Sequence, residues 1–437
     1  MTRKGRGDLT RLVEPDRVHR SVYVDPAIFE SEMEAIFHRA WIYVGHESQV
    51  QRPGDYCTVL VGRQPMIMVR HSDGQVHVLY NRCAHRGAML CGNLRGNTGE
   101  AFTCSYHSWR YNTNGSLESM PLPKGYDGTR LSAANQERNL KRAARVAAYR
   151  GFVFASLAAD GPSLMDFLGD AKIAFDDMCD RAPEGQVDIV QTCFRIVQHS
   201  NWKIFMENQL DALHPSVTHE SSGQAAAQVE RDIARRGGKA PLDYHYLSAF
   251  TTPLPKWDEV LTVNYQHGHS ALQGYMGLRP QDPDSLAYEA MMRKHYGAKR
   301  TEEILGVNIH HVLLYPGLSV QSALQQVRAV RPLAVDRTLI EIWHFRLKGA
   351  PEAIYRRALG YYNLINSPST IVNADDLENF WRCHQGLASD GGAWVSFHRN
   401  AGQDDEQDGV IRSRWGTSEA PMRNQFRAWT QYIGGGR

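Results

Sequence analysis

Two short pairs of metal-binding residues constrain the fold of this chain more than any other feature of its sequence. One residue separates Cys83 from His85, two residues separate Cys104 from His107, and eighteen residues lie between the pairs. Four such ligands hold either one Zn²⁺ or a two-iron, two-sulfur cluster in which two imidazoles replace two thiolates on one iron. In both cases the two loops must meet at one point of the fold.

The distribution of ligand types favours the cluster. Zinc ribbons and fingers usually place two like residues in each pair, whereas each pair here contains one cysteine and one histidine. That split suits a cluster with two thiolates on one iron and two imidazoles on the other. Glycines around the ligands let the backbone wrap closely and direct N–H groups at sulfides; they stand at 87, 92, 96 and 99. From these residues alone, a structural zinc site and a buried Cys/His set without metal stay open as alternatives.

The composition excludes several other classes of protein. The 437 residues include 49 Lys and Arg against 47 Asp and Glu, without the long basic run of a nucleic-acid-binding protein. No stretch reaches the ~18 apolar residues of a membrane span, and the N-terminus lacks the apolar segment of a signal peptide. Seven cysteines, an odd number, argue against a disulfide framework. We therefore expect a cytoplasmic protein that binds neither nucleic acid nor membrane.

The apolar pattern predicts an α+β protein in which a small all-β domain is inserted into a larger domain. Residues 45–158 alternate short apolar runs with Gly, Asn and Asp turns. Residues 1–44 are predicted to form a helical segment that packs on the larger domain, which covers 159–437. There we expect an antiparallel sheet, with strands over 310–347, flanked by helices. The predicted helices are 163–178, 202–214 and 351–364, and the predicted mobile loops are 220–242 and 401–409.

A second group of candidate ligands lies in the larger domain. His214 and His219 are five residues apart, or about 140° around an ideal helix, so an unbroken helix cannot bring both to one metal. We expect Pro215 to end or kink the helix between them. Asp211 lies on the face of His214, where its carboxylate can accept a hydrogen bond from the imidazole nitrogen that is not on the metal. The alternative is a polar helix end without metal.

Two histidines and one carboxylate form the facial triad of non-haem Fe(II) oxygenases. Asp375 and Asp376 are the best carboxylate candidates, because adjacent buried acids are costly unless they are paired or metal-bound. The alternative for this pair is a solvated helix start with one Asp as the N-cap.

Taken together, these motifs resemble the Rieske non-haem iron aromatic-ring-hydroxylating oxygenases, large (alpha) subunit. The pattern C-x-H…C-x-x-H is followed by W-x-Y, and E-N-x-x-D-x-x-H-x-x-x-x-H is followed after ~150 residues by D-D-x-x-N. The similar segments cover nearly the whole chain and include PGDY at 53–56, NWK at 201–203, the strand pair within 315–347 and SEAPMRNQFRAW at 418–429. The departures are a segment between the ligand pairs that is about one residue longer than usual, and Pro215.

The resemblance implies roles for individual residues. Asp376, the second Asp of its pair, would bind a mononuclear Fe(II) together with His214 and His219. Asp211 would link His107 of one subunit to His214 of its neighbour, and Asn208 matches an asparagine near the iron. The implied ligands of a Rieske [2Fe-2S] cluster are Cys83, His85, Cys104 and His107.

The resemblance also implies a reaction and partners. We expect an oxygenase component that uses O2 to hydroxylate an aromatic substrate, with dihydroxylation as the expected reaction. A monooxygenase or demethylase of the same family, and a Rieske-type electron-transfer protein without oxygenase activity, are the alternatives. Because no G-x-G-x-x-G follows a strand, electrons from NAD(P)H must arrive through a separate reductase, with or without a ferredoxin. The expected assembly is a homotrimer, or an α3β3 complex with a small subunit.

Two polar residues indicate which class of substrate the chain accepts. Gln209 and Asn366, ten residues before Asp376, stand where hydrocarbon oxygenases of the family carry apolar side chains. An unpaired polar group in a pocket costs ~1–3 kcal/mol, so we expect an aromatic acid rather than an unsubstituted hydrocarbon. The alternative is that both side chains point away from the pocket or bind water. We expect the substrate pocket to be lined by Asn208, Gln209, Ala212 and Leu213, by the strands around 310–328 and by the stretch leading into Asp376.

Overall fold

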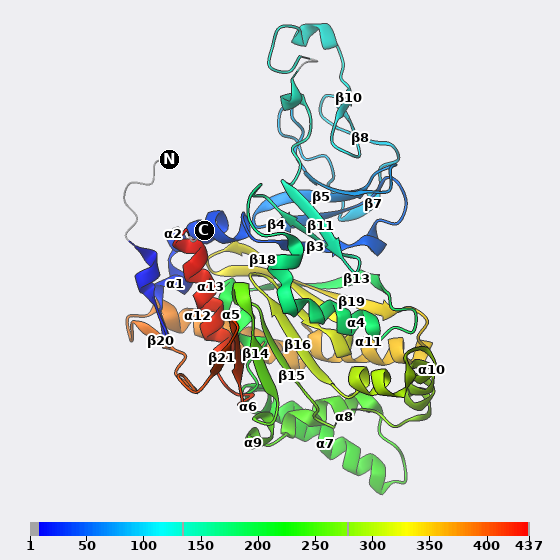
Figure 1. Ribbon diagram of the computed structural model, residues 1–437, viewed down its shortest axis with the longest axis vertical. Helices are drawn as coiled ribbons and strands as arrows, with labels where there is room; N and C mark the ends of the chain where they lie inside the picture. Colours follow the sequence, from blue (N-terminus) through cyan, green and yellow to red (C-terminus); the bar gives the residue numbers. More distant parts are fainter. Residues whose placement is uncertain (1–7, 133–134, 278, 436–437) are drawn as a thin grey trace. The chain divides into compact units, whose positions relative to one another are not determined.

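The computed structural model describes residues 8–132, 135–277 and 279–435 (Figure 1). Residue contacts divide the chain into two compact units, Phe37–Leu164 and the combination of Met1–Ile36 with Met165–Arg437. The predicted boundaries at 44/45 and 158/159 lie a few residues inside the first unit, and residues 1–7 of the predicted N-terminal segment lie outside the described residues. Within the described ranges, every helix is too short or too polar to cross a membrane.

The unit Phe37–Leu164 consists of antiparallel sheets, as the turn-rich pattern predicts. The sheet orders are β6-β5-β4-β7, β10-β9-β8 and β11-β12-β3. Gly74 and Gly115 have φ of 85° and 91° in the turns after β5 and β9, a conformation that glycine adopts without steric cost. The strands are β3 (Ile42–His46), β4 (Asp55–Val61), β5 (Gln64–Arg70), β6 (Val76–Tyr80), β7 (Arg95–Asn97), β8 (Ala101–Thr103), β9 (Arg110–Asn112), β10 (Leu117–Ser119), β11 (Arg145–Tyr149) and β12 (Phe152–Ser156); the 3-10 turns are η3 (Glu47–Gln49), η4 (Pro123–Tyr126) and η5 (Gln136–Arg138).

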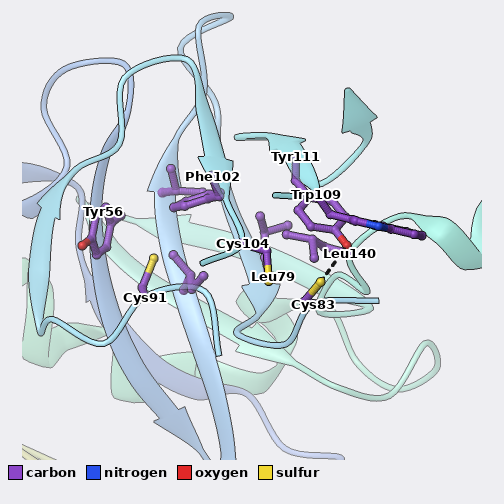
Figure 2. Close-up of a cluster of buried hydrophobic side chains, with 11 residues drawn as sticks. Tyr56, Leu79, Cys83, Cys91, Phe102, Cys104, Trp109, Tyr111 and Leu140 are labelled. Atoms are coloured by element: carbon purple, nitrogen blue, oxygen red, sulfur yellow. Dashed lines mark hydrogen bonds between the residues drawn. The ribbon is translucent and has the colours of Figure 1, made fainter. Parts of the chain in front are cut away.

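A buried cluster of side chains fills this unit beside the two ligand loops (Figure 2). Trp109 and Tyr111 are 1% and 0% exposed, and Cys83 and Cys104 lie in the same cluster. The remaining buried members are Tyr56, Ile67, Val69, Leu79, Cys91, Phe102 and Leu140. Burial of these large side chains gives the loops a rigid base.

The other unit is built on one large antiparallel sheet with the order β13-β19-β18-β17-β16-β15-β14-β22-β21. The strands predicted over 310–347 are confirmed as the consecutive strands β16 to β19. The strands are β13 (Val187–Gln198), β14 (Leu261–Asn264), β15 (Ser270–Gly274), β16 (Ile309–Leu314), β17 (Leu318–Gln321), β18 (Gln326–Ala334), β19 (Arg337–Leu347), β21 (Asp405–Gln407) and β22 (Val410–Ser413), and a small second sheet pairs β1 (Val13–Glu14), β2 (Arg17–His19) and β20 (Trp394–Ser396).

Helices of this unit pack on the large sheet, α4 against β16 and β17, α11 against β19, and α13 against β14 and β15 (Figure 1). The α-helices are α1 (Ser21–Val24), α2 (Pro26–Glu32), α3 (Leu164–Leu168), α4 (Ile173–Asp180), α5 (Trp202–Asn208), α6 (Pro215–Thr218), α7 (Glu220–Arg235), α8 (Leu242–Ser248), α9 (Leu254–Trp257), α10 (Pro283–Leu305), α11 (Glu352–Asn366), α12 (Ile371–Ala388) and α13 (Ala420–Ile433). The short helical turns are η1 (Leu9–Leu12), η2 (Met33–Phe37), η6 (Gly169–Lys172), η7 (Ala249–Thr251), η8 (Gln266–Gly268) and η9 (Ser322–Leu324).

The prediction that 220–242 is a mobile loop is wrong, because most of this stretch forms α7. Its fully buried positions are small residues, Ser222, Gly223 and Ala226, which indicate burial less clearly than large apolar side chains do. A Cβ on Gly223 would lie 3.1 Å from Phe250, so the glycine permits this close approach. In the stretch 401–409, likewise predicted as a loop, residues 405–407 form β21.

A buried carboxylate joins three helices of this unit. Glu32 in α2 is fully buried and accepts hydrogen bonds from Lys203 Nζ at 2.6 Å and Trp202 Nε1 at 2.9 Å, both in α5. It also accepts from Trp429 Nε1 in α13 at 2.7 Å. A buried charge is stable only when it is paired and hydrogen-bonded in this way. The network fixes α5, which ends at Asn208.

Candidate functional site

The structure brings the four predicted cluster ligands together. Cys83 and His85 lie in the loop after β6, and Cys104 and His107 lie between β8 and β9. Both cysteines are 2% exposed, and the two imidazole centroids are 4.6 Å apart. The first loop is closed by a hydrogen bond from Gly87 N–H to the Cys83 carbonyl at 2.9 Å, with φ of 75° at the glycine. Positive φ at this position explains why a glycine follows the first ligand pair.

The surroundings of these residues fit an iron–sulfur cluster. The Tyr111 hydroxyl lies 3.2 Å from Cys83 Sγ (Figure 2) and accepts a hydrogen bond from the Ala84 N–H at 3.1 Å. Trp109 stacks on His85 with ring centroids 5.1 Å apart. Within the described residues, His85 Nδ1 is buried and lacks a hydrogen-bond partner, so its lone pair is available to a metal. Burial raises the pKa of the Cys83 thiol, and a coordinated metal would compensate the buried thiolate.

The predicted iron ligands lie on either side of a break in the chain. Helix α5 ends at Asn208, and α6 begins with Pro215. The expectation that Pro215 ends the helix is therefore wrong. Proline is favoured at the first position of a helix, where its missing N–H has no partner to lose. The break occurs earlier, where Asp211 Oδ1 accepts the Leu213 N–H at 2.8 Å, a local bond that competes with the helix.

The two histidines and Asp376 converge across this break. Asp376 Oδ1, in α12, lies 3.3 Å from His219 Nε2 and 3.7 Å from His214 Nε2. One ligand atom from each of the three residues lies within 4.8 Å of the others. Two neutral imidazoles and one carboxylate, with further positions open, are the donor set of a non-haem Fe(II) site. The residues therefore fit a mononuclear iron.

Asn208 and Asp211 lie beside this triad, as predicted from the motif. Asn208 Nδ2 is 3.1 Å from His214 Nε2 and donates to Asp376 Oδ1 at 3.3 Å. Asp211 Oδ2 is 3.6 Å from His214 Nδ1, and its side chain is 36% exposed. Burial by itself lowers the pKa of His214, but the neighbouring Asp211 and Asp376 outweigh it and raise that pKa. Asp375 faces Nδ1 of His219 instead of the metal side.

A cavity of about 260 Å³ opens at the triad. Gln209 and Ala212 line it as expected, whereas Leu213 is not among the described lining residues, because the helix that would have placed it there ends at Asn208. The expectation that Asn366 lines this cavity is also wrong. Asn366 is 2% exposed and donates to Gln326 Oε1 at 2.5 Å, which satisfies its amide inside the protein. Gln209 is paired as well, so neither side chain is a lone polar group in the pocket.

The main polar group that sequence reasoning missed is Arg328 in β18, which lines the cavity. Its Nη1 donates to Gln209 Oε1 at 3.0 Å and its Nη2 donates to Gln321 Oε1 at 3.2 Å. The sequence feature that could have identified Arg328 is its position as a single cation within the largely apolar run QVRAV at 326–330. His311 of β16 also lines the cavity, and burial lowers its pKa to about 3, so its imidazole is neutral.

Comparison with known proteins identifies a family for each of the two parts of the chain. The family of the Rieske [2Fe-2S] domain matches residues 40–136, and that of the ring hydroxylating alpha subunit (catalytic domain) matches residues 188–434. The chain is 34% identical to the toluate 1,2-dioxygenase subunit alpha of Pseudomonas putida, over 87% of this chain and 82% of that protein. It is 32% identical to the anthranilate 1,2-dioxygenase large subunit of Acinetobacter baylyi, over 95% and 89%.

A solved structure of naphthalene 1,2-dioxygenase with indole bound in its active site superposes with a TM-score of 0.79 at 25% identity, and covers 97% of this chain and 93% of that one. The two family matches account for both cofactors, a Rieske [2Fe-2S] cluster and a mononuclear iron in the catalytic domain. The ligand sets found here, one in each compact unit, have the donor chemistry that these cofactors require. The chain belongs to the alpha subunits of the aromatic-ring-hydroxylating dioxygenases, which are oxidoreductases.

Proposed function

We propose that this chain dihydroxylates the ring of a benzoate-type aromatic acid. The observation that carries the proposal is the Arg328 guanidinium in the cavity that opens at the His214–His219–Asp376 triad. A cavity of about 260 Å³ lies just below the range of roughly 300–1,000 Å³ that is usual for drug-sized ligands, which suits a single-ring substrate.

The assignment of ligands follows from donor chemistry and position. His214 and His219 would bind the iron through Nε2, with Asp376 as the third ligand. The cluster would be held by the thiolates of Cys83 and Cys104 on one iron and by the imidazoles of His85 and His107 on the other. When both groups are bound, the cluster supplies single electrons and the mononuclear iron supplies the activation of O2.

Among the described residues, Arg328 forms no ion pair with a carboxylate. In the part of the chain that the structure describes, its hydrogen bonds go to two neutral amide oxygens, those of Gln209 and Gln321. The other cavity-lining arginines are already paired, for example Arg181 with Asp177 at 3.1 Å and Arg357 with Asp282 at 2.8 Å. Burial lowers the pKa of Arg328, which means that its charged form is under-solvated. A substrate carboxylate would supply the missing counter-charge and fork-like hydrogen bonds.

The position of Arg328 directs such a substrate toward the iron site. Its partner Gln209 donates to Asn208 Oδ1 at 3.0 Å, and Asn208 in turn donates to Asp376 Oδ1 at 3.3 Å. Two side chains, those of Gln209 and Asn208, therefore separate Arg328 from the triad. The ring of a substrate whose carboxylate binds Arg328 would lie between Arg328 and the triad. The relatives named above act on toluate and anthranilate, which are aromatic carboxylates.

Electrons would arrive from a separate NAD(P)H-dependent reductase, directly or through a ferredoxin. His107 and Asp211 are both accessible at the surfaces of their units. This exposure supports a bridge in which Asp211 accepts a hydrogen bond from His107 of a neighbouring subunit and contacts His214 of its own. We therefore propose a cyclic trimer, with or without a small subunit.

The test is a reconstituted assay with a reductase of this class and a substrate panel. Benzoate, toluate and anthranilate are compared with toluene, naphthalene and biphenyl, and oxygen uptake is matched to product with ¹⁸O2. We expect coupled formation of a diol that contains two ¹⁸O atoms from the acids. Coupled turnover of the neutral hydrocarbons alone would refute the substrate class, and one ¹⁸O atom per product would identify a monooxygenase. An active monomer in light scattering would refute the trimer.

A further inference from the structure

The two adjacent aspartates of α12 face opposite edges of one imidazole ring. Asp376 Oδ1 lies 3.3 Å from Nε2 of His219, on the side of the triad. Asp375 Oδ2 lies 3.3 Å from Nδ1 of the same ring, on the side away from the triad. The His219 side chain is 3% exposed, so water does not compete effectively for either nitrogen.

Helix geometry explains why the two nitrogens of His219 are contacted by two different aspartates. Successive residues of an α-helix point about 100° apart, so only one of the pair can face the triad. The other reaches the far edge of the ring. The Phe250 ring packs against His219 with centroids 5.1 Å apart and limits the plane of the imidazole. Within that plane, the contact with Asp375 determines which nitrogen faces the metal.

The contact also determines the tautomer. A carboxylate accepts a hydrogen bond but cannot donate one, so Asp375 keeps the proton on Nδ1 and leaves the lone pair of Nε2 for the metal. A carboxylate in this position also makes the metal-bound nitrogen more basic. His214 also has a carboxylate on this side, but Asp211 Oδ2 lies 3.6 Å from its Nδ1, which is beyond hydrogen-bond distance. Each histidine of the triad therefore has its own carboxylate behind it.

We propose that Asp375 is a positioning residue for the iron site, which fixes the orientation and tautomer of His219 and thereby sets the affinity of the triad for Fe(II). Asp375 does not itself contact the metal. The inference rests on the assignment of His219 and Asp376 as iron ligands in the proposed function.

The experiment measures metal affinity directly, in protein that keeps its cluster but has lost the mononuclear metal. Fe²⁺, or Co²⁺ followed by its visible absorption, is titrated in competition with a chelator. Asp375→Ala and Asp375→Leu both lack the acceptor, and we expect each to bind 10- to 100-fold more weakly, the usual effect of losing such a contact. Asp375→Asn keeps an acceptor oxygen and is expected to lie within a few-fold of the unmodified protein.

Glu378→Ala is the matched control, because Glu378 lies one turn further along α12 and pairs with Arg382 at the surface. It should leave metal affinity unchanged, and every variant should keep the visible spectrum of the cluster. Unchanged affinity in Asp375→Ala or Asp375→Leu, or an equal loss in Asp375→Asn, would overturn the inference. Unchanged affinity in Asp376→Ala would instead refute the ligand assignment, so the two failures are distinguishable.

Discussion

Replacement of Arg328 by glutamine should change substrate choice without removing either metal. The guanidinium donates to Gln209 and Gln321, and among the described residues it makes no hydrogen bond to a member of the triad. Glutamine keeps polarity at this position but loses the charge and the forked donors that a carboxylate requires. The effect on an aromatic acid is therefore the loss of one charge-assisted pair.

Two values bracket the size of this loss. Removing one partner of a buried ion pair costs about 3–5 kcal/mol, and removing a hydrogen bond to a charged group costs about 1.5–3 kcal/mol. Arg328 is only partly buried because it faces the cavity, so we take about 2–4 kcal/mol. At about 1.4 kcal/mol per factor of ten, kcat/KM for benzoate should fall roughly 30- to 1,000-fold. For benzamide, which has a similar shape and no charge, the change should stay below about tenfold.

The assay compares kcat/KM for benzoate and benzamide in the unmodified enzyme, in Arg328→Gln and in Arg357→Gln. Arg357 also lines the cavity but already pairs with Asp282, so its replacement should not change the ratio of the two rates. Iron content and the cluster spectrum verify that each variant is loaded. An equal loss for both substrates in Arg328→Gln would show that Arg328 is structural, and no loss for benzoate would place the carboxylate elsewhere.

Three further outcomes are expected. The unmodified chain should contain about three irons and two inorganic sulfides, and Cys83→Ser should lose the cluster in an iron and sulfide assay; stoichiometric zinc without sulfide would contradict this. Asp211→Asn should keep both metals yet lose most electron transfer in single turnover of pre-reduced enzyme, whereas loss of the mononuclear iron would make Asp211 a ligand. Burial raises the pKa of Glu207 to about 8 from an ordinary value of 4.5, so the native state holds a proton that the unfolded chain releases. Stability should therefore fall as pH rises between these values, by about 5 kcal/mol at most, and Glu207→Gln should flatten the fall in urea unfolding; equal slopes would disprove the assignment.

The metal sites could be predicted because their chemistry restricts the residue types. Only a few side chains bind iron, so the spacing of Cys83, His85, Cys104 and His107 carries information without any knowledge of the fold. The same holds for His214 and His219, although the local path between them could not be predicted. Helix α5 ends at Asn208, and beyond it Asp211 Oδ1 accepts the Leu213 N–H; the apolar pattern contains no sign of either feature.

The proposed substrate contact, Arg328, could not be predicted from the sequence, because its place in the cavity depends on long-range packing. Arg328 meets Gln209 across 119 positions of sequence, and only the assembled sheet brings them together. Asn366 shows the converse. Its position ten residues before Asp376 predicts that it lines the substrate pocket. In the structure its amide instead donates a hydrogen bond to the buried Gln326. Helix α7 was not predicted, because its most buried positions are small residues such as Gly223 and Ala226 within a largely polar segment.

The carboxylate of Glu32 has a consequence for the synthesis of the chain on the ribosome. Its donors are Trp202, Lys203 and Trp429, and the last of these lies 397 positions further along the sequence. Until Lys203 has emerged the carboxylate of Glu32 has no counter-charge, and until Trp429 has emerged it lacks one of its three donors, so the segment that carries Glu32 cannot dock fully. Docking is completed only after α13 has emerged. The catalytic unit thus depends on contacts of high sequence separation, which are slow to form.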